Sequence, residues 1–333
     1  MAYIEIQDIA KWYDYKAPTL IGQLKGGKKY IKAVDGINLS IDKGDILGII
    51  GESGCGKSTL GRMLVRLEDP TRGDVLVDGV STNDLLRKDR KSFRRTVQII
   101  FQNPFDTFTP RDTIRQILQR TLRIHAIGAD EAARDKLIHE ALEGSGLVPV
   151  EDIVNRYPHE LSGGQLQRIS ITRAMLLDPS IVIADEPVSM LDVSVRADII
   201  NLLIHLSQTR GTTMVFISHD IALTRYTCDV VAVMYLGRVV EYGLTDEVIS
   251  NPQHPYTKVL ISNCTSIDPE DKQDPIPIEG EPPTPLDPGA GCYFAPRCPY
   301  AVDACFKKYP DKQVISDSHY AVCDRINAIQ DES

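Results

Sequence analysis

Short apolar runs alternate with helically periodic segments along most of the chain. DILGII (residues 45–50), SIVIADEP (180–187) and TTMVFISHD (212–220) are short and mostly apolar, which is typical of strands buried in a parallel sheet. Apolar residues recur at helical spacing within residues 112–147 and 198–211. Because strands and helices alternate, the sequence predicts an α/β fold with a parallel core.

Two further segments have clear local signals. DVVAVMYLGRVVEYG (residues 229–243) predicts a hairpin that turns at Leu236 and Gly237. STLGRMLVRLEDP (residues 58–70) has leucine and methionine at helical spacing and ends in proline, which predicts a helix.

The composition changes after about Ser262. Proline and acidic residues are frequent over residues 268–291, which predicts an extended linker, and a cysteine-bearing tail follows. We therefore expect a large domain over residues 1–262 and a small Cys/Pro-rich C-terminal extension over residues 263–333.

Charge and composition narrow the class of protein. The net charge of −9 over 333 residues provides no bulk basic surface, so we expect no nucleic-acid partner. The chain has no run of about 18 apolar residues, so we expect no membrane span. The first residues lack the features of a signal peptide, so we expect a cytosolic location. Thiols stay reduced there, and the seven cysteines are interpreted as thiols or metal ligands.

GESGCGKST follows a predicted strand and opens a predicted helix. It matches the phosphate-binding pattern GxxxxGK[ST], in which glycines let backbone N–H groups surround phosphates and the lysine adds a positive charge. The serine hydroxyl is expected to bind Mg²⁺. The alternative is a glycine-rich turn with an incidental lysine, which the flanking strand and helix disfavour. The predicted nucleotide-binding residues are Gly51, Glu52, Ser53, Gly54, Cys55, Gly56, Lys57, Ser58 and Thr59.

Two acidic residues end the predicted strand SIVIADEP. Asp185 is expected to bind Mg²⁺, and Glu186 is expected to orient or deprotonate the attacking water. Acids also end strands without any catalytic role, but the phosphate-binding motif in the same chain favours the catalytic interpretation.

A second glycine-containing stretch, LSGGQ (residues 161–165), identifies a superfamily. Together with the motifs above, it resembles the signature motif of the ATP-binding subunits of ABC transporters. The resemblance implies an ABC-type P-loop ATPase core with an antiparallel β subdomain and a helical subdomain at about residues 103–165. It also implies that two subunits pack head to tail, with each signature motif acting on the ATP of its partner. The residues implied are Ser162, Gly163, Gly164 and Gln165.

The same resemblance implies roles for four more residues. Gln102 is similar to the glutamine that touches Mg²⁺ and links ATP to the membrane subunits. Asp192 ends SMLD, which resembles the loop that crosses the dimer interface. His219 resembles the switch histidine that binds the γ-phosphate. Tyr13 resembles the aromatic residue that stacks on adenine, although the neighbouring Trp12 and Tyr15 are alternatives.

The last eighty residues resemble one branch of the superfamily. NPQHPYTKVL (residues 251–260) and IEGEPPTPLDPGAGCYFAPRCPYAVDAC (278–305) are similar to segments of the ATPases of oligopeptide and dipeptide importers. This implies a peripheral position on the cytoplasmic face of the cell membrane. It also implies two membrane permease subunits, a sister ABC ATPase and an extracytoplasmic substrate-binding protein. Related importers carry nickel or oligosaccharides, so these cargos are alternatives to peptides.

Phe105, Phe108 and Pro110 follow the predicted glutamine. They are interpreted either as part of the contact with a membrane subunit or as helix-packing residues.

Four cysteines of the tail form a C-x5-C-x6-C-x17-C array: Cys292, Cys298, Cys305 and Cys323. Four clustered thiols can hold a [4Fe–4S] cluster or a structural zinc ion. The short C-x2-C of most zinc sites is absent, and some members of this importer branch carry a cluster, so a cluster is favoured over zinc and over unligated thiols.

Other ABC proteins fit less well. Those of DNA repair need long coiled coils or basic surfaces, which this sequence lacks. Translation-type proteins carry two cassettes in one chain, and exporter ATPases usually carry fused membrane spans. We therefore expect an ATPase that uses ATP and Mg²⁺ to energise peptide import.

Overall fold

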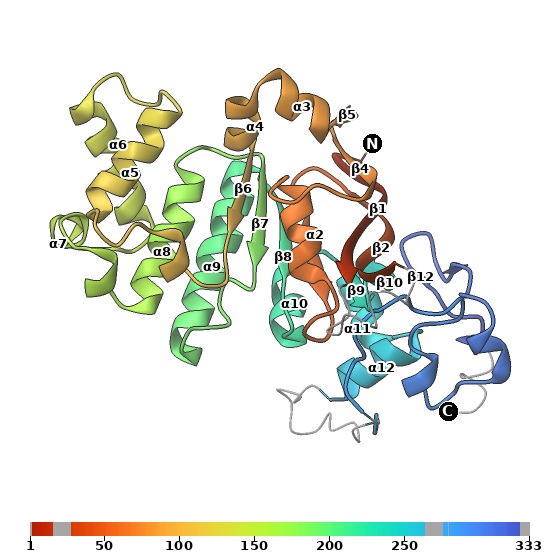
Figure 1. Cartoon of the computed structure of the whole chain (residues 1–333). Helices are drawn as coiled ribbons and strands as arrows, with labels where there is room; N and C mark the ends of the chain where they lie inside the picture. The colour runs from red at the N-terminus through yellow and green to blue at the C-terminus, as the bar shows by residue number, and fades with distance from the viewer. Residues whose placement is uncertain (1, 16–27, 264–275, 279, 327–333) are drawn as a thin grey trace, which may run out of the picture. The chain divides into compact units, whose positions relative to one another are not determined.

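The computed structural model describes residues 2–15, 28–263, 276–278 and 280–326 (Figure 1). The chain divides into two compact units, which are described separately. The first unit contains Met1–Ile41, Ile46–Ser81 and Ile217–Ser333, and the second contains Asp42–Asp45 and Thr82–Phe216.

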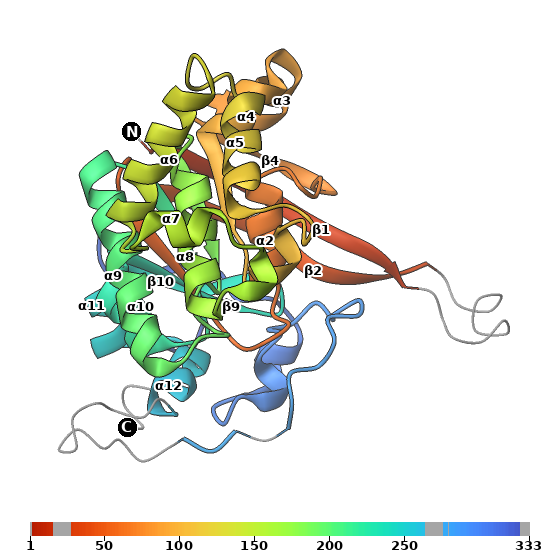
Figure 2. The same cartoon turned by 90° about the vertical axis from the view of Figure 1, so that its left-hand side faces the viewer.

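An antiparallel sheet opens the first unit. Its strands are β1 (Ile4–Tyr15), β2 (Lys29–Ile41), β4 (Arg72–Val77) and β5 (Val80–Ser81), in the order β2-β1-β4-β5. All three neighbouring pairs are antiparallel, and Figure 2 shows β1 and β2 as a long paired ribbon. The antiparallel β subdomain implied by the family resemblance is therefore confirmed.

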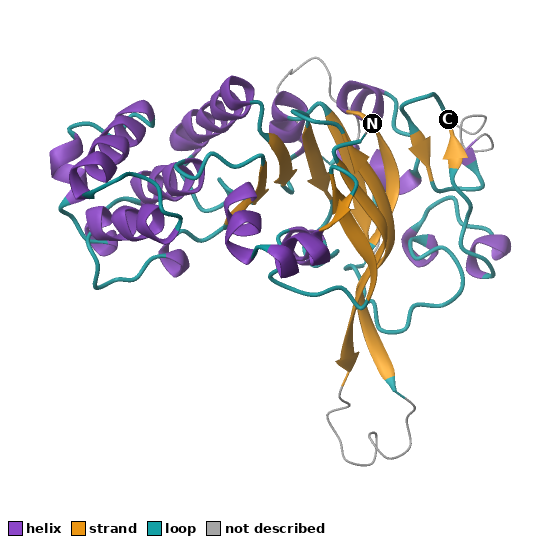
Figure 3. Ribbon diagram, turned by 90° about the horizontal axis from the view of Figure 1, so that it is seen from above, coloured by secondary structure: helices purple, strands orange, loops and turns teal. Residues whose placement is uncertain are grey.

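Five further strands of the first unit pair in the order β11-β12-β10-β9-β3. Figure 3 shows the strands of the described residues in orange. β3 and β9 are parallel, as expected for the core, and β10 is antiparallel to β9. Leu236 and Gly237 both have positive φ at the β9–β10 turn, which confirms the predicted hairpin. The strands are β3 (Ile46–Ile50), β9 (Val230–Tyr235), β10 (Arg238–Leu244), β11 (Gln313–Val314) and β12 (Tyr320–Ala321).

Helices and short 3-10 turns complete the first unit. The helix predicted after the phosphate-binding motif is present but ends at Leu64, before the exposed Leu67, because the chain leaves the helix with Arg66 at positive φ. The helices and turns are α2 (Lys57–Leu64), α10 (Ile221–Thr227), α11 (Thr245–Ser250), α12 (Pro255–Ser262), η3 (Ala295–Arg297) and η4 (Asp303–Phe306).

The C-terminal extension is joined to this unit through a buried carboxylate. Glu241 accepts hydrogen bonds from the backbone N–H groups of Gln253 and His254, and its carboxylate lies 2.8 Å from Nε2 of His319. Ser262 precedes the predicted linker, of which residues 268–275 and 279 lie outside the described part. Leu286, within the described part, forms an isolated bridge to β2.

The second unit combines three strands with a largely helical region. Its strands run in the order β8-β7-β6, and β6 and β7 are parallel. A core cluster of fourteen buried residues, from Phe108 to Ile169, holds the helical region together and agrees with the helical region expected from the resemblance. The elements are α3 (Thr82–Lys88), α4 (Arg90–Thr96), β6 (Val97–Ile100), η1 (Phe105–Thr107), α5 (Ile114–Ile124), α6 (Glu131–Gly144), α7 (Val150–Val154), η2 (Pro158–Glu160), α8 (Gly163–Met175), β7 (Ile181–Asp185), α9 (Val193–Arg210) and β8 (Thr213–Ile217).

None of the helices in the described ranges is both long enough and apolar enough to cross a lipid bilayer.

Candidate nucleotide site

The phosphate-binding motif forms a tight loop between β3 and α2. Gly51 and Gly56 have φ of +150° and +104°. A Cβ at Gly51 would lie 2.2 Å from the carbonyl oxygen of Met234, and one at Gly56 would lie 2.0 Å from that of Ala33. The packing therefore requires glycine at both positions.

Lys57 lies inside this loop and is buried. Its Nζ donates to the carbonyl oxygens of Gly51, at 2.7 Å, and Glu52, at 3.0 Å. Cys55, the other buried side chain of the loop, has its Sγ 3.9 Å from the same ammonium group. The ammonium therefore braces the curved backbone from within.

The loop leads directly into the N-terminus of α2. This helix begins at Lys57, and its N-cap residue, Gly56, provides no side-chain cap. The N–H groups of the first turn, which includes Ser58 and Thr59, thus face the loop without a capping side chain. Such an end favours a bound anion such as phosphate.

The aromatic residues of β1 differ in how they are held. The Trp12 indole donates to Asp35, and its ring lies under the cations of Lys32 and Arg72. Tyr13 is 37% exposed, and its hydroxyl donates to Glu68. Partial burial, followed by the contact with Glu68, raises the pKa of Tyr13. The exposed ring of Tyr13 agrees with the predicted adenine contact, and the alternative Tyr15 is 38% exposed, whereas Trp12 is already packed.

His219 follows β8 and is exposed. The next residue, Asp220, caps α10 by accepting from the backbone N–H of Leu223. The histidine is therefore presented on a short, anchored turn.

In the second unit, the two acids follow β7 as predicted. Asp185 is buried, whereas Glu186 has φ of +46°, an uncommon conformation for a residue with a side chain. Ser189 holds that conformation by donating its N–H and its hydroxyl to the carbonyl oxygen of Glu186.

The structure brings Gln102 and Glu186 together, although they are 84 positions apart in the sequence. The Gln102 side-chain amide donates to the Glu186 carboxylate at 2.9 Å. The amide thus orients the carboxylate that is predicted to act on water.

The signature motif begins α8. Ser162 is the N-cap residue, and it forms a capping box with Gln165: the Ser162 hydroxyl accepts from the Gln165 N–H, and the Gln165 amide oxygen accepts from the Ser162 N–H. A Cβ at Gly164 would lie 2.7 Å from Val195, so α9 packs against the glycine. Gly163 is the first residue of α8. The capping box and the contact with α9 hold the start of this helix in place.

The loop before α9 exposes its side chains. Asp192 is exposed at the N-cap position and makes no capping bond, and Met190 is 64% exposed.

The two phenylalanines after Gln102, interpreted either as membrane-subunit contacts or as helix-packing residues, differ in burial. Phe108 is buried under the guanidinium of Arg173, which favours packing, whereas Phe105 is 50% exposed.

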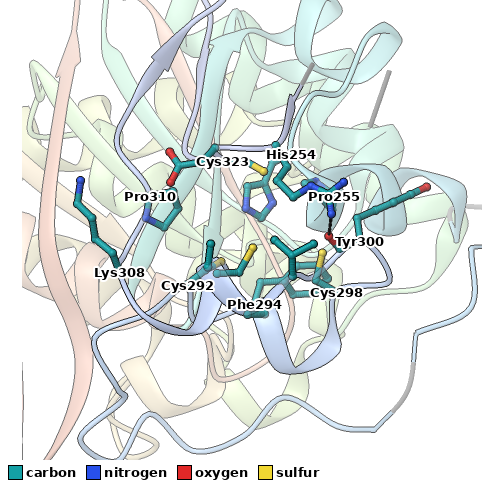
Figure 4. A pocket seen from close by; sticks show the side chains of 15 residues that line it. His254, Pro255, Cys292, Phe294, Cys298, Tyr300, Lys308, Pro310 and Cys323 are labelled. Atoms are coloured by element: carbon teal, nitrogen blue, oxygen red, sulfur yellow. Dashed lines mark hydrogen bonds between the residues drawn. The ribbon is translucent and has the colours of Figure 1, made fainter. Parts of the chain in front are cut away.

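Four cysteines of the tail surround one cavity of about 60 Å³ in the first unit. Figure 4 shows Cys292, Cys298 and Cys323 around this cavity, with His254 beside them. Burial raises the pKa of Cys298 to about 12 and that of Cys323 to about 11. Cys305 also lines this cavity.

Among the described residues, no three His, Cys, Asp or Glu side chains converge closely enough to hold one metal ion. A structural zinc ion needs four ligands, with sulfurs about 2.3 Å from a single centre. The arrangement of the thiols thus provides no ready-made zinc site.

Sequence reasoning missed two residues that touch the phosphate-binding loop. Arg297 forms an ion pair with the Glu52 side chain, and the Tyr256 hydroxyl accepts from the Glu52 N–H. The hydrogen bond to the Glu52 carboxylate raises the pKa of Arg297 above its ordinary value. Both residues lie far from the loop in sequence, within segments that otherwise signal only the importer branch.

Two family models match the chain. Residues 34–189 match the family described as ABC transporter, and residues 240–305 match the family described as Oligopeptide/dipeptide transporter, C-terminal region. Oligopeptide transport ATP-binding protein AppF of Bacillus subtilis is 42% identical over 323 residues, which cover 96% of each chain. A protein of Brucella ovis named for peptide import and ATP binding is 42% identical over 324 residues, covering 97% of this chain and 98% of its own.

The chain belongs to the ATP-binding proteins of oligopeptide/dipeptide ABC transporters.

Solved structures of ABC transporter cassettes share the fold. The dimeric ABC transporter cassette MJ0796 is 30% identical, with a TM-score of 0.61, over 73% of this chain and 98% of the cassette. CbiO1 from Clostridium perfringens is 27% identical, with a TM-score of 0.60, over 75% of this chain and 91% of its own. This oligopeptide/dipeptide-family protein is thus an ABC-type ATPase whose hydrolysis of ATP is coupled to transport.

Proposed function

We propose that this ATPase energises the import of oligopeptides or dipeptides through membrane permease subunits. The observation that carries the proposal is the match of residues 240–305 to the oligopeptide/dipeptide transporter family, in a chain that also carries a full set of ATP motifs. The ATPase lies on the cytoplasmic face of the membrane. Two permeases, a sister ATPase and an external binding protein complete the importer.

Each motif has one role toward ATP and Mg²⁺. Lys57 and the loop N–H groups from Gly51 to Thr59, apart from that of Glu52, bind the phosphates, and Ser58, Gln102 and Asp185 bind Mg²⁺. Charge neutralisation and positioning supply most of the catalysis of phosphoryl transfer. The described loop geometry supports the phosphate assignment, because its glycines and uncapped helix start fit an anion.

The hydrolytic step needs a base and a sensor. Glu186 accepts a proton from the attacking water, with its carboxylate oriented by Gln102. His219 hydrogen-bonds the γ-phosphate, and Tyr13 stacks on adenine. Asp192 lies at the dimer interface.

The signature motif acts on the nucleotide of a facing ATPase. Ser162, Gly163, Gly164 and Gln165 form a helix start, and a helix N-terminus favours a negatively charged group. ATP therefore closes the dimer by attracting donors from both chains, and hydrolysis releases it. The related cassette MJ0796 is described as dimeric, including in a post-hydrolysis state bound to ADP and Pi.

Cells whose gene carries Glu186→Gln are expected to take up labelled dipeptides and oligopeptides only at background rate, because the importer loses its energy source. The measurement is uptake of labelled peptides, nickel and oligosaccharides in parallel. Glu140→Gln, on the surface of α6, is the matched control and should retain peptide uptake. Normal peptide uptake with loss of nickel or oligosaccharide uptake would assign one of those cargos instead.

We also propose that Cys292, Cys298, Cys305 and Cys323 hold a [4Fe–4S] cluster. The four thiols line one cavity, and each cysteine of such a cluster binds a different iron, so the sulfurs need not converge on one centre. This fits the described cavity better than a single zinc ion does. The cluster would add structure to a small tail with little core of its own.

Anaerobic purification is expected to yield a brown protein with absorbance near 400 nm and about four irons per chain, as Cys₄ ligation of a [4Fe–4S] cluster requires. Cys298→Ser together with Cys323→Ser should lose both signals. Cys228→Ser, at a buried thiol away from the cavity, is the control and should keep them. Anaerobically prepared protein without iron, with or without zinc, would refute the cluster.

A further inference from the structure

The phosphate-binding loop is held from outside by the C-terminal part of the chain. Arg297 makes a two-pronged contact with the Glu52 carboxylate: Nη1 donates to Oε2 at 2.7 Å and Nη2 to Oε1 at 3.1 Å. The hydroxyl of Tyr256, on α12, accepts from the Glu52 backbone N–H at 2.8 Å. The carboxylate and the backbone N–H of Glu52 therefore both contact residues in the C-terminal part of the chain.

These two contacts are built on rigid supports. The Arg297 side chain is 7% exposed, and its guanidinium also donates to the carbonyl oxygen of Gly280. Tyr256 is fully buried, with its ring 4.6 Å from that of Tyr235 and 5.3 Å from that of Phe294. Buried side chains with such neighbours cannot move without disturbing the packing.

Glu52 also connects these contacts to Lys57. Its carbonyl oxygen accepts from Lys57 Nζ at 3.0 Å, so a shift of Glu52 displaces an anchor of the loop lysine. Glu52 directly follows Gly51, so its carboxylate belongs to the loop that is proposed to bind the triphosphate. An unpaired negative charge there would repel the nucleotide, and the guanidinium neutralises it.

We infer that Arg297 and Tyr256 are positioning residues for nucleotide binding: they fix Glu52 and hence the phosphate-binding loop. The inference rests on the proposed function, in which this loop binds ATP. Arg297 ends the turn η3, which lies between Cys292 and Cys298 and borders the cysteine-lined cavity (Figure 4). The extension is thus a structural part of the nucleotide site, and Glu52 serves the loop rather than a phosphate.

The test is equilibrium binding of Mg²⁺ with a non-hydrolysable ATP analogue to the full-length chain and to single and double variants. Arg297→Gln should weaken binding by about tenfold or more, because the unpaired Glu52 carboxylate then repels the phosphates. Glu52→Gln should have a smaller effect. The double variant Arg297→Gln/Glu52→Gln should bind more tightly than Arg297→Gln alone, because no unpaired carboxylate remains.

Two readouts separate positioning from general stability. The loss in Arg297→Gln, relative to wild type, should shrink as salt rises, because salt screens the unpaired carboxylate of Glu52, whose side chain is 25% exposed. Tyr256→Phe should weaken binding with little change in that salt dependence, because it removes an acceptor and no charge. Arg297→Lys keeps a cation and should bind between wild type and Arg297→Gln. If Arg297→Gln does not fold, Arg297→Lys takes its place in the comparison.

Lys307→Gln is the matched control, since Lys307 is an exposed cation of the extension that does not line the cysteine cavity. It should bind as wild type does. Loss of binding in Lys57→Ala with wild-type binding in Arg297→Gln would overturn this inference alone. Wild-type binding in both variants would overturn the proposed function and the inference with it. Additive losses in the double variant would also contradict the inference, because they show no coupling between Arg297 and Glu52.

Discussion

Glu186→Gln is expected to lower steady-state ATP hydrolysis by about a hundredfold or more, the usual contribution of a general base. The amide keeps the shape of the side chain but cannot accept the proton of the attacking water. Glutamine also retains an oxygen that can accept the hydrogen bond from Gln102, so the local structure should survive. ATP binding should persist, because the carboxylate is not among the groups assigned to the phosphates.

The measurement is phosphate release at saturating ATP together with nucleotide binding on the same preparation. Glu140→Gln, at an exposed position of α6, should hydrolyse ATP as wild type does. Near wild-type turnover in Glu186→Gln would remove this residue from its role. Turnover lost together with nucleotide affinity would mean that Glu186 contributes to binding.

Lys57→Ala is expected to weaken binding of Mg²⁺ and ATP by at least about tenfold, which corresponds to about 1.4 kcal/mol, close to the lower end of the range of about 1.5–3 kcal/mol for a hydrogen bond to a charged group. Two losses combine. The phosphates lose a cation, and the carbonyl groups of Gly51 and Glu52 lose the donor that holds the loop curved.

Equilibrium titration with nucleotide measures this effect, and thermal unfolding reports any loss of stability. Lys136→Ala removes an exposed lysine of α6 and should leave the affinity unchanged. If Lys57→Ala bound nucleotide with unchanged affinity, the phosphate-loop assignment would be wrong.

Local sequence signals predicted much of this fold. β3, β7 and β8 are fully buried strands, and each appeared as a short apolar run. The β9–β10 hairpin followed from its Leu236-Gly237 turn. Such features depend on residues that are close together in the sequence, so the sequence alone predicts them.

Long-range contacts left weaker signals. The Arg297–Glu52 pair joins residues 245 positions apart, and nothing in either local sequence indicates the other. β11 and β12 have two residues each, too few to show a periodic pattern. The different burial of Phe105 and Phe108 likewise depends on where the helices pack, which a linear pattern does not specify.

The candidate site divides in the same way. Sequence motifs predicted roles for Gln102 and Glu186 separately, and the structure shows the hydrogen bond that joins them. The positive φ of Glu186 could not be predicted, because glycine or asparagine is the usual signal for that conformation. The roles of these residues toward ATP, Mg²⁺ and a facing subunit stay predictions.

A structure of the Glu186→Gln variant, trapped with Mg²⁺ and ATP together with its partner ATPase, tests the central claim most directly. The account predicts two facing chains, with each triphosphate between Lys57 or its counterpart on one chain and the signature motif of the other. Ser162 and Gly164 should then lie within hydrogen-bond distance of the partner's nucleotide. One chain enclosing its triphosphate alone, with Ser162 far from any nucleotide, would contradict the account.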